Sequence, residues 1–171
     1  SLLVVYITIK LGSSNEDAKV ALASTFILGN VPTAISSYKA RHMSSCTGLP
    51  DSGDPSGADA VRAELLNRGL VGTTPWNEEW IAQYHNEERL LQIILPLAGS
   101  EDPAGSAQDI VNNIYDAPQI DGLAVATGIG ALDYATDNEL EDSDSDGALD
   151  PITVATTIGR GDSIQIWYDC I

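Results

Sequence analysis

The acidic run Asp137–Asp150, with the sequence DNELEDSDSDGALD, contains the side chains best suited to bind a metal ion. Its core is a D-x-D-x-D-G motif formed by Asp142, Asp144, Asp146 and Gly147. Oxygen ligands at alternate positions, followed by a glycine that permits a sharp turn, suit a loop that wraps Ca²⁺. The twelfth position counted from Asp142 is Thr153 and not the glutamate of an EF-hand, so we expect Asp150 or backbone carbonyls to complete an irregular site. The alternative is a solvated acidic loop without an ion.

The two cysteines, Cys46 and Cys170, are placed so that one bridge would tie the last strand back to the end of the first helix. The bridge would close a loop of 124 residues (170 minus 46), which the chain-entropy model credits with more than about 4 kcal/mol. It would also imply an oxidising compartment. The alternative is two buried free thiols in a cytosolic protein, because spacing alone does not show pairing.

The tripeptide Arg160-Gly161-Asp162 is of the type that mediates receptor adhesion. The same residues, preceded by Gly159, are also what a hairpin turn requires. We therefore interpret this stretch as a turn and not as an adhesion motif.

No combination of residues in the sequence indicates catalysis. The only histidines, His42 and His85, lack the H-x-x-x-H or C-x-x-C neighbours of a metal or nucleophile site. Gly128 and Gly130 lack the third glycine and the following helix of a nucleotide-binding fingerprint. We expect no enzymatic activity.

The charge balance narrows the range of partners. The sequence has 25 acidic and 8 basic residues, which gives a net charge of −17 over 171 residues. Nucleic acids and anionic membrane surfaces are therefore poor partners. A hydrophobic content of 43% with 19% charged residues indicates a globular chain, and its length suits one domain with a real core.

The first 45 residues predict the element around which the others are arranged. From Ser14 to Ser44, apolar residues recur three to five positions apart, which indicates a helix. Further apolar residues lie on its other faces, so the helix needs covering partners on more than one side. At about 1.5 Å per residue it reaches roughly 46 Å, more than a small domain covers.

The segment Leu2–Ile9 before this helix is apolar and rich in β-branched residues. It is too short to span a bilayer, which takes about 20 residues. Taken alone, it could be a buried strand or the core of a signal peptide.

After Cys46 the pattern predicts mostly sheet. The expected elements are helices at 59–68 and 102–116, strands at 90–98 and 123–127, and a hairpin of strands 152–158 and 163–168 around a turn at 159–162. Residues 78–89 are consistent with either a helix or the start of a strand. A helix followed by antiparallel strands is an α+β arrangement.

An apolar segment, a polar break and a helix reading EDAKV at 16–20 and AISSYK at 34–39 occur in this order. This order resembles the N-terminal helix of type IV pilins and of the related pseudopilins of type II secretion. In that family the helix ends in a similar A-I-x-x-Y-K turn, and the resemblance covers about 45 residues. The family's mature chain opens with Phe-Thr-Leu-Ile-Glu, so either the present sequence is truncated by about a dozen residues or the chain is a divergent member.

The resemblance implies a fold with a long N-terminal helix packed on a small antiparallel sheet and stapled by one disulfide. Residues 1–45 would form a helical stem and residues 46–171 a globular α+β head. Many pilins carry a disulfide in the C-terminal region, which favours the bridge between Cys46 and Cys170. Several pseudopilins carry a calcium loop near the C-terminus, which favours Ca²⁺ in the acidic run.

The function implied by the resemblance is that of a structural subunit of a prokaryotic filament, extracellular or on the cell surface. The subunits would polymerise with copies of themselves through the N-terminal helices after residing in the inner membrane. The expected assembly interface consists of Leu2, Leu3, Val4, Val5, Ile7 and Ile9. A pseudopilin of type II secretion is the first alternative, favoured by the acidic loop and disfavoured by the terminal disulfide. A free secreted calcium-binding or adhesion module, with residues 1–11 as a strand of its own core, is the second.

Overall fold

The structure, a computed structural model, describes residues 15–171. Its first element is one helix, Asn15–Ala40, called here the N-terminal helix; η1 and α2 are parts of it. The elements are, in order, η1 (Phe26–Asn30), α2 (Val31–Ala40), α3 (Gly57–Asn67), β1 (Ile81–His85), β2 (Leu90–Pro96), α4 (Pro103–Ile114), β3 (Gly122–Ala126), α5 (Tyr134–Asp137) and β4 (Ser163–Asp169). The expected apolar interface at Leu2–Ile9 lies outside the described residues.

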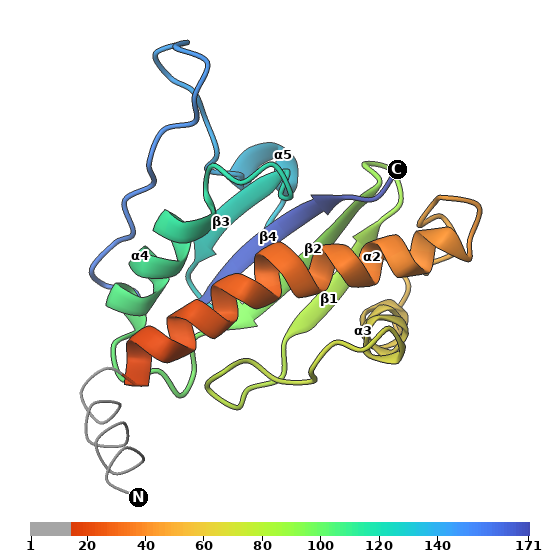
Figure 1. Cartoon of the computed structure of the whole chain (residues 1–171), viewed down its shortest axis with the longest axis horizontal. Helices are drawn as coiled ribbons and strands as arrows, with labels where there is room; N and C mark the ends of the chain where they lie inside the picture. Colours follow the sequence, from red (N-terminus) through yellow and green to blue (C-terminus); the bar gives the residue numbers. More distant parts are fainter. Residues whose placement is uncertain (1–14) are drawn as a thin grey trace, which may run out of the picture.

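The four strands form one antiparallel sheet in the order β1-β2-β4-β3 (Figure 1). The last strand, β4, lies between β2 and β3. It pairs with β2 from Leu90 opposite Asp169 to Pro96 opposite Ser163. With the N-terminal helix and one disulfide, this sheet confirms the predicted α+β fold.

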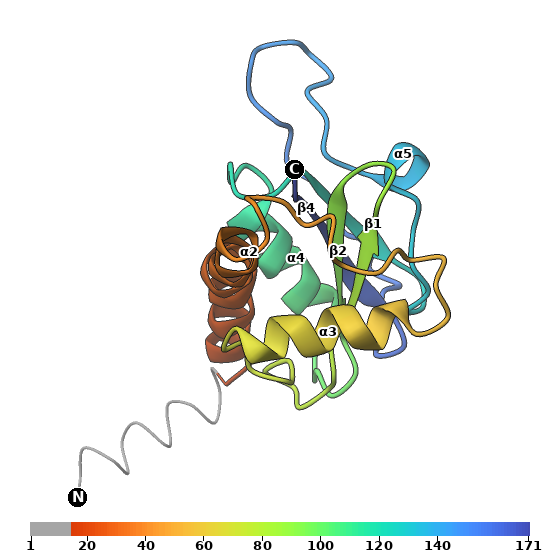
Figure 2. The same ribbon diagram turned by 90° about the vertical axis from the view of Figure 1, so that its right-hand side faces the viewer.

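The N-terminal helix lies along one face of the sheet (Figures 1 and 2). Its buried residues run from Val20 to Tyr38, so the domain covers most of the helix and not only one end. The helix ends at Ala40, a few residues earlier than the apolar pattern predicts. Met43 and Ser44 adopt left-handed φ angles of 59° and 60°, which no helix continues.

The predicted C-terminal hairpin is wrong, because residues 152–158 form no strand. Ile152 and Val154 are buried in the main hydrophobic core, as the alternating pattern requires, but no strand pairs with them. The Gln108 side chain takes the place of a partner strand. It donates to the Ile152 carbonyl at 2.9 Å and accepts from the Val154 N–H at 2.8 Å. β4 is thereby free to pair with two other strands.

The helix widens into a π-helical turn at η1, and this turn leaves one buried carbonyl without a helical donor. The Val31 N–H bonds to the Phe26 carbonyl instead of the Ile27 carbonyl. The next residue, Pro32, has no N–H to offer. The Tyr168 hydroxyl from β4 donates to the Ile27 carbonyl at 2.7 Å. Burial raises the pKa of Tyr168 well above its usual value, so the hydroxyl keeps the proton it donates.

We expect Tyr168→Phe to lower the free energy of unfolding by about 1–3 kcal/mol, because the Ile27 carbonyl then stays buried without a partner. Equilibrium denaturation in urea measures the change. Tyr134→Phe is the matched control, since the Tyr134 hydroxyl makes only a long bond of 3.4 Å to the Asp121 carbonyl at an exposed site. Equal losses in the two variants would show that Tyr168 does not support the widened turn.

Candidate functional site

The acidic loop projects away from the sheet (Figures 1 and 2). At its tip, carboxylate oxygens of Asp142, Asp144 and Asp146 lie within 4.8 Å of one another. Asp142 accepts from the Gly147 N–H at 2.9 Å, and Gly147 has a φ of +90° that favours glycine. Partial desolvation raises the pKa of Asp142, but the hydrogen bond from Gly147 and further bonds from the loop lower it more, so the net pKa is lowered.

Asp150, expected to complete the ligand set, does not join these three carboxylates among the described residues. Its carboxylate accepts from both the backbone N–H and the hydroxyl of Ser143. Its own N–H donates to the Glu141 carbonyl at 2.8 Å. Asp150 therefore joins the two sides of the loop at its base by hydrogen bonds.

The calcium assignment stays a prediction, and a melting experiment tests it. If Ca²⁺ binds the three carboxylates, it stabilises the folded protein and raises the melting temperature. At a free Ca²⁺ concentration of 100 times the dissociation constant, the added stability is about 2.7 kcal/mol. Asp144→Asn should remove the shift, whereas Asp137→Asn, outside the cluster, should keep it. Identical melting curves with chelator and with excess Ca²⁺ would show that the acidic run is a solvated loop that binds no Ca²⁺.

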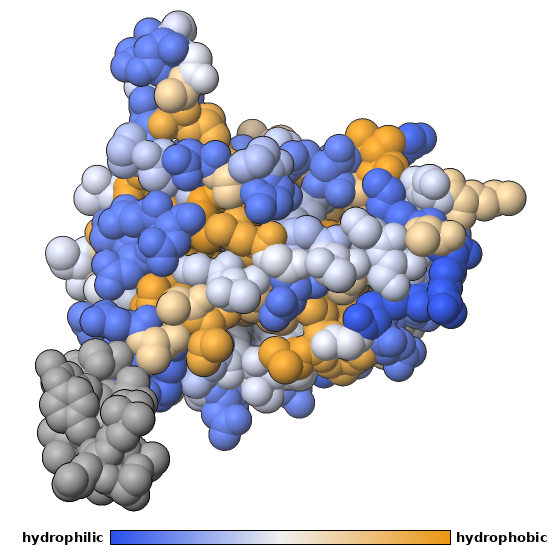
Figure 3. All heavy atoms as spheres, in the orientation of Figure 1, coloured by the Kyte–Doolittle hydropathy of each residue, from blue (hydrophilic) through white to orange (hydrophobic). Residues whose placement is uncertain are grey.

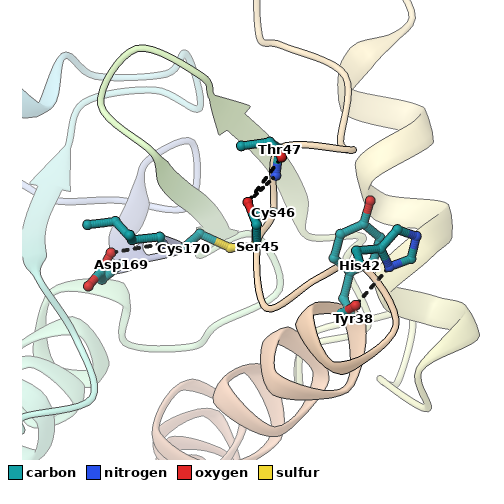
Figure 4. The surroundings of a disulfide bond; sticks show 8 residues. Tyr38, His42, Ser45, Cys46, Thr47, Asp169 and Cys170 are labelled. Carbon is teal, nitrogen blue, oxygen red and sulfur yellow. Dashed lines mark hydrogen bonds between the residues drawn. A yellow bond between two sulfur atoms is a disulfide. The ribbon is translucent and has the colours of Figure 1, made fainter.

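The disulfide joins Cys46 to Cys170, with the two Cα atoms 5.5 Å apart (Figure 4). Cys46 follows the turn at the end of the helix, and Cys170 follows β4. Both residues are buried. The bridge thus fastens β4, one of the two inner strands of the sheet, to the helix that covers it.

The Arg-Gly-Asp stretch forms a turn, although not the predicted hairpin turn because no strand precedes it, and its charged groups are engaged within the protein. The Arg160 guanidinium donates to the Ser100 carbonyl at 2.8 Å. The Asp162 carboxylate accepts from the Gly128 and Gly159 N–H groups, both at 2.8 Å, and these bonds lower its pKa. Both side chains have a structural role that accounts for their presence.

The N-terminal helix carries no charged residue from Val20 to Tyr38. One side of this stretch packs on the sheet and the other faces solvent. The exposed side consists of Ala21, Leu22, Thr25, Gly29, Asn30, Thr33 and Ser36. In Figure 3 the surface along the helix is largely pale or orange, with stronger blue toward the margins. A protein of net charge −17 thus has a long surface free of carboxylates.

Among the described residues, only this helix has the length and composition of a membrane-spanning segment. Its most apolar 18 residues have a mean hydropathy of 1.3, and 44% of them are buried inside the molecule. The core helix of a soluble protein shows the same features, so hydropathy alone does not assign the helix to a membrane.

Glu16 fastens the first turn of the helix to the domain, a contact that sequence reasoning missed. Its carboxylate accepts from the Trp76 indole at 3.0 Å and from the Ser100 and Ser106 hydroxyls at 2.9 and 2.8 Å. The Glu101 N–H donates to it at 3.3 Å. Partial burial raises the pKa of Glu16, but these hydrogen bonds outweigh that effect and the net pKa is lowered. The donors lie 60 to 90 residues away in the sequence, so no local pattern signals the contact.

The lowered pKa of Glu16 predicts a pH-dependent contribution to stability. The folded-state pKa lies below the usual value of 4.5. The contribution is therefore fully present above that pH and is lost as pH falls through the folded-state pKa. At pH 7 we expect Glu16→Gln to destabilise by about 1 kcal/mol, and the difference from wild type should shrink below pH 4.5. Urea unfolding across this pH range measures it. Asp17→Asn, one residue away and exposed, is the matched control and should change stability at pH 7 by about 0.5 kcal/mol or less.

Comparison with known proteins adds no relative: no protein-family model, curated protein or solved structure matches this chain.

Proposed function

We propose that this chain is a structural subunit of an extracellular or cell-surface helical filament of the type IV pilin kind. In the filament, the N-terminal helices bundle in the core and the globular heads face outward. The observation that carries the proposal is the charge-free outer face of the helix between Val20 and Tyr38.

The charge of the chain makes this face the best candidate for self-association. Two copies of a protein with a net charge of −17 repel each other over most of their surface. A contact between identical copies is most favourable where carboxylates are absent, since a buried unpaired charge is strongly unfavourable. The exposed small residues, such as Ala21, Thr25 and Gly29, also let a neighbouring helix approach closely.

Two further features support the proposal. The disulfide between Cys46 and Cys170 is compatible with an oxidising, extracellular compartment. The helix has the length and composition of a membrane-spanning segment, which suits a subunit stored in the inner membrane before assembly. The apolar sequence Leu2–Ile9 precedes this helix in the chain.

Electron microscopy of the purified protein in negative stain tests the proposal. We expect filaments of uniform diameter under conditions that promote assembly. A protein that stays monomeric at high concentration, in detergent and after detergent removal, would contradict it and favour a free secreted module. Short filaments that form only with Ca²⁺ would favour the pseudopilin alternative.

A further inference from the structure

An apolar groove lies between the N-terminal helix and the segment that follows α3. It has a volume of about 320 Å³. Its lining consists of Leu22, Phe26, Asn30, Val71, Thr73, Thr74 and Pro75. No lining residue is charged, and the two aliphatic side chains at its rim, Leu22 and Val71, are 61% and 60% exposed.

The groove is held open by fixed contacts. Phe26 forms part of its lining, and its ring packs on Trp80 with centroids 5.8 Å apart. The Trp80 indole donates to the Val71 carbonyl at 2.7 Å, and Arg62 donates to the Gly72 carbonyl. The far side is held by a turn in which the Asn77 N–H donates to the Thr74 carbonyl at 2.9 Å. Binding in such a preformed groove requires little ordering of the protein.

We propose that this groove binds the apolar segment Leu2–Ile9 of a neighbouring copy. The inference rests on the proposed function, because the occupant is another subunit. Within residues 15–171, the other large exposed hydrophobic side chains are Met43, Ile129 and Ile171, which are scattered singly. Leu2–Ile9 is the remaining contiguous apolar run of the sequence, and it contains no charge. It therefore matches the uncharged groove, whereas the acidic surface of the rest of the chain does not.

Such a contact is heterologous, since a segment of one copy meets a different surface of the next. Heterologous contacts that do not close by rotation give open chains of subunits. Each copy then has one groove and one segment. When a copy with a damaged groove is mixed with a copy with a damaged segment, one of the two possible contacts between them should still form.

The test uses two full-length variants, Leu22→Asp with a damaged groove and Val5→Asp with a damaged segment. Each variant alone should form no filaments and remain monomeric by sedimentation. An equimolar mixture should form dimers containing one copy of each variant, because the intact segment of the first fits the intact groove of the second. Ile129→Asp, which places the same charge on an exposed aliphatic residue elsewhere, should assemble like wild type.

Two outcomes overturn the proposal. Monomers in the mixture would show that the segment does not reach a neighbour's groove, while wild-type filaments would still support the proposed function through other contacts. Self-association of Val5→Asp as strong as that of wild type would show that something else fills the groove. Conversely, if the mixture forms dimers but the wild-type protein forms no filaments, this contact exists and the proposed filament function is refuted. Circular dichroism confirms folding of each variant, and Val71→Asp replaces Leu22→Asp if that variant unfolds.

Discussion

Thr25→Asp is expected to abolish filament formation while leaving the isolated subunit as stable as wild type. Thr25 is exposed in the middle of the charge-free face of the N-terminal helix. In a single subunit the new carboxylate stays in water, where a surface substitution changes stability by about 0.5 kcal/mol or less. In a filament core it would be buried without a partner, which is strongly unfavourable at every repeat.

The measurement is electron microscopy combined with thermal melting of the monomer. Thr156→Asp provides the matched control, because it makes the same exchange at an exposed position of the 155–157 segment, far along the chain from the helix. The control should assemble normally. If Thr25→Asp formed filaments as readily as Thr156→Asp, the charge-free face would not be the assembly surface.

Removing the disulfide is expected to destabilise the subunit more than any other single change discussed above, by about 2–5 kcal/mol. The bridge between Cys46 and Cys170 spans 124 residues of sequence. Without it, the unfolded chain gains conformational freedom and the inner strand β4 loses its covalent link to the helix. A loss of this size is a large part of the total stability of a small domain, about 5–15 kcal/mol.

Denaturation of the double variant Cys46→Ser with Cys170→Ser measures this loss. The double exchange avoids a free thiol that could pair between copies. Reduction of the wild-type protein should lower the denaturation midpoint by a similar amount, while reductant should leave the double variant unchanged. A double variant as stable as oxidised wild type would show that non-covalent packing holds β4 in place by itself.

Local patterns in the sequence predicted most of the elements, and they failed where a distant residue decides the structure. The helical spacing of apolar residues in Val20–Tyr38 predicted the helix because one face is buried over its whole length. The alternation at 152–158 predicted a strand, but burial alone produces that pattern. The bonds from Gln108, 44 and 46 residues away, replaced those of a partner strand.

In the candidate sites, too, local features could be predicted from the sequence and contacts between distant residues could not. The spacing of Asp142, Asp144 and Asp146 correctly placed their carboxylates close together, because a short loop brings alternate residues to one point. The hydrogen bonds that Glu16 and Tyr168 form with distant parts of the domain could not be predicted from the sequence. Each joins residues at least 60 positions apart in the sequence.

The position of β4 between β2 and β3 has a consequence for how the protein is made. β2 and β3 do not pair with each other, and both pair with β4, which begins only at Ser163. During synthesis, the residues up to β3 therefore leave the ribosome before the strand that joins them exists. The helix, too, receives the hydroxyl of Tyr168 only at that stage. Until then the nascent chain exposes unpaired strand edges that are prone to aggregate. We therefore expect the domain to fold after translation of β4 and to benefit from a chaperone that shields the unpaired strands before that point.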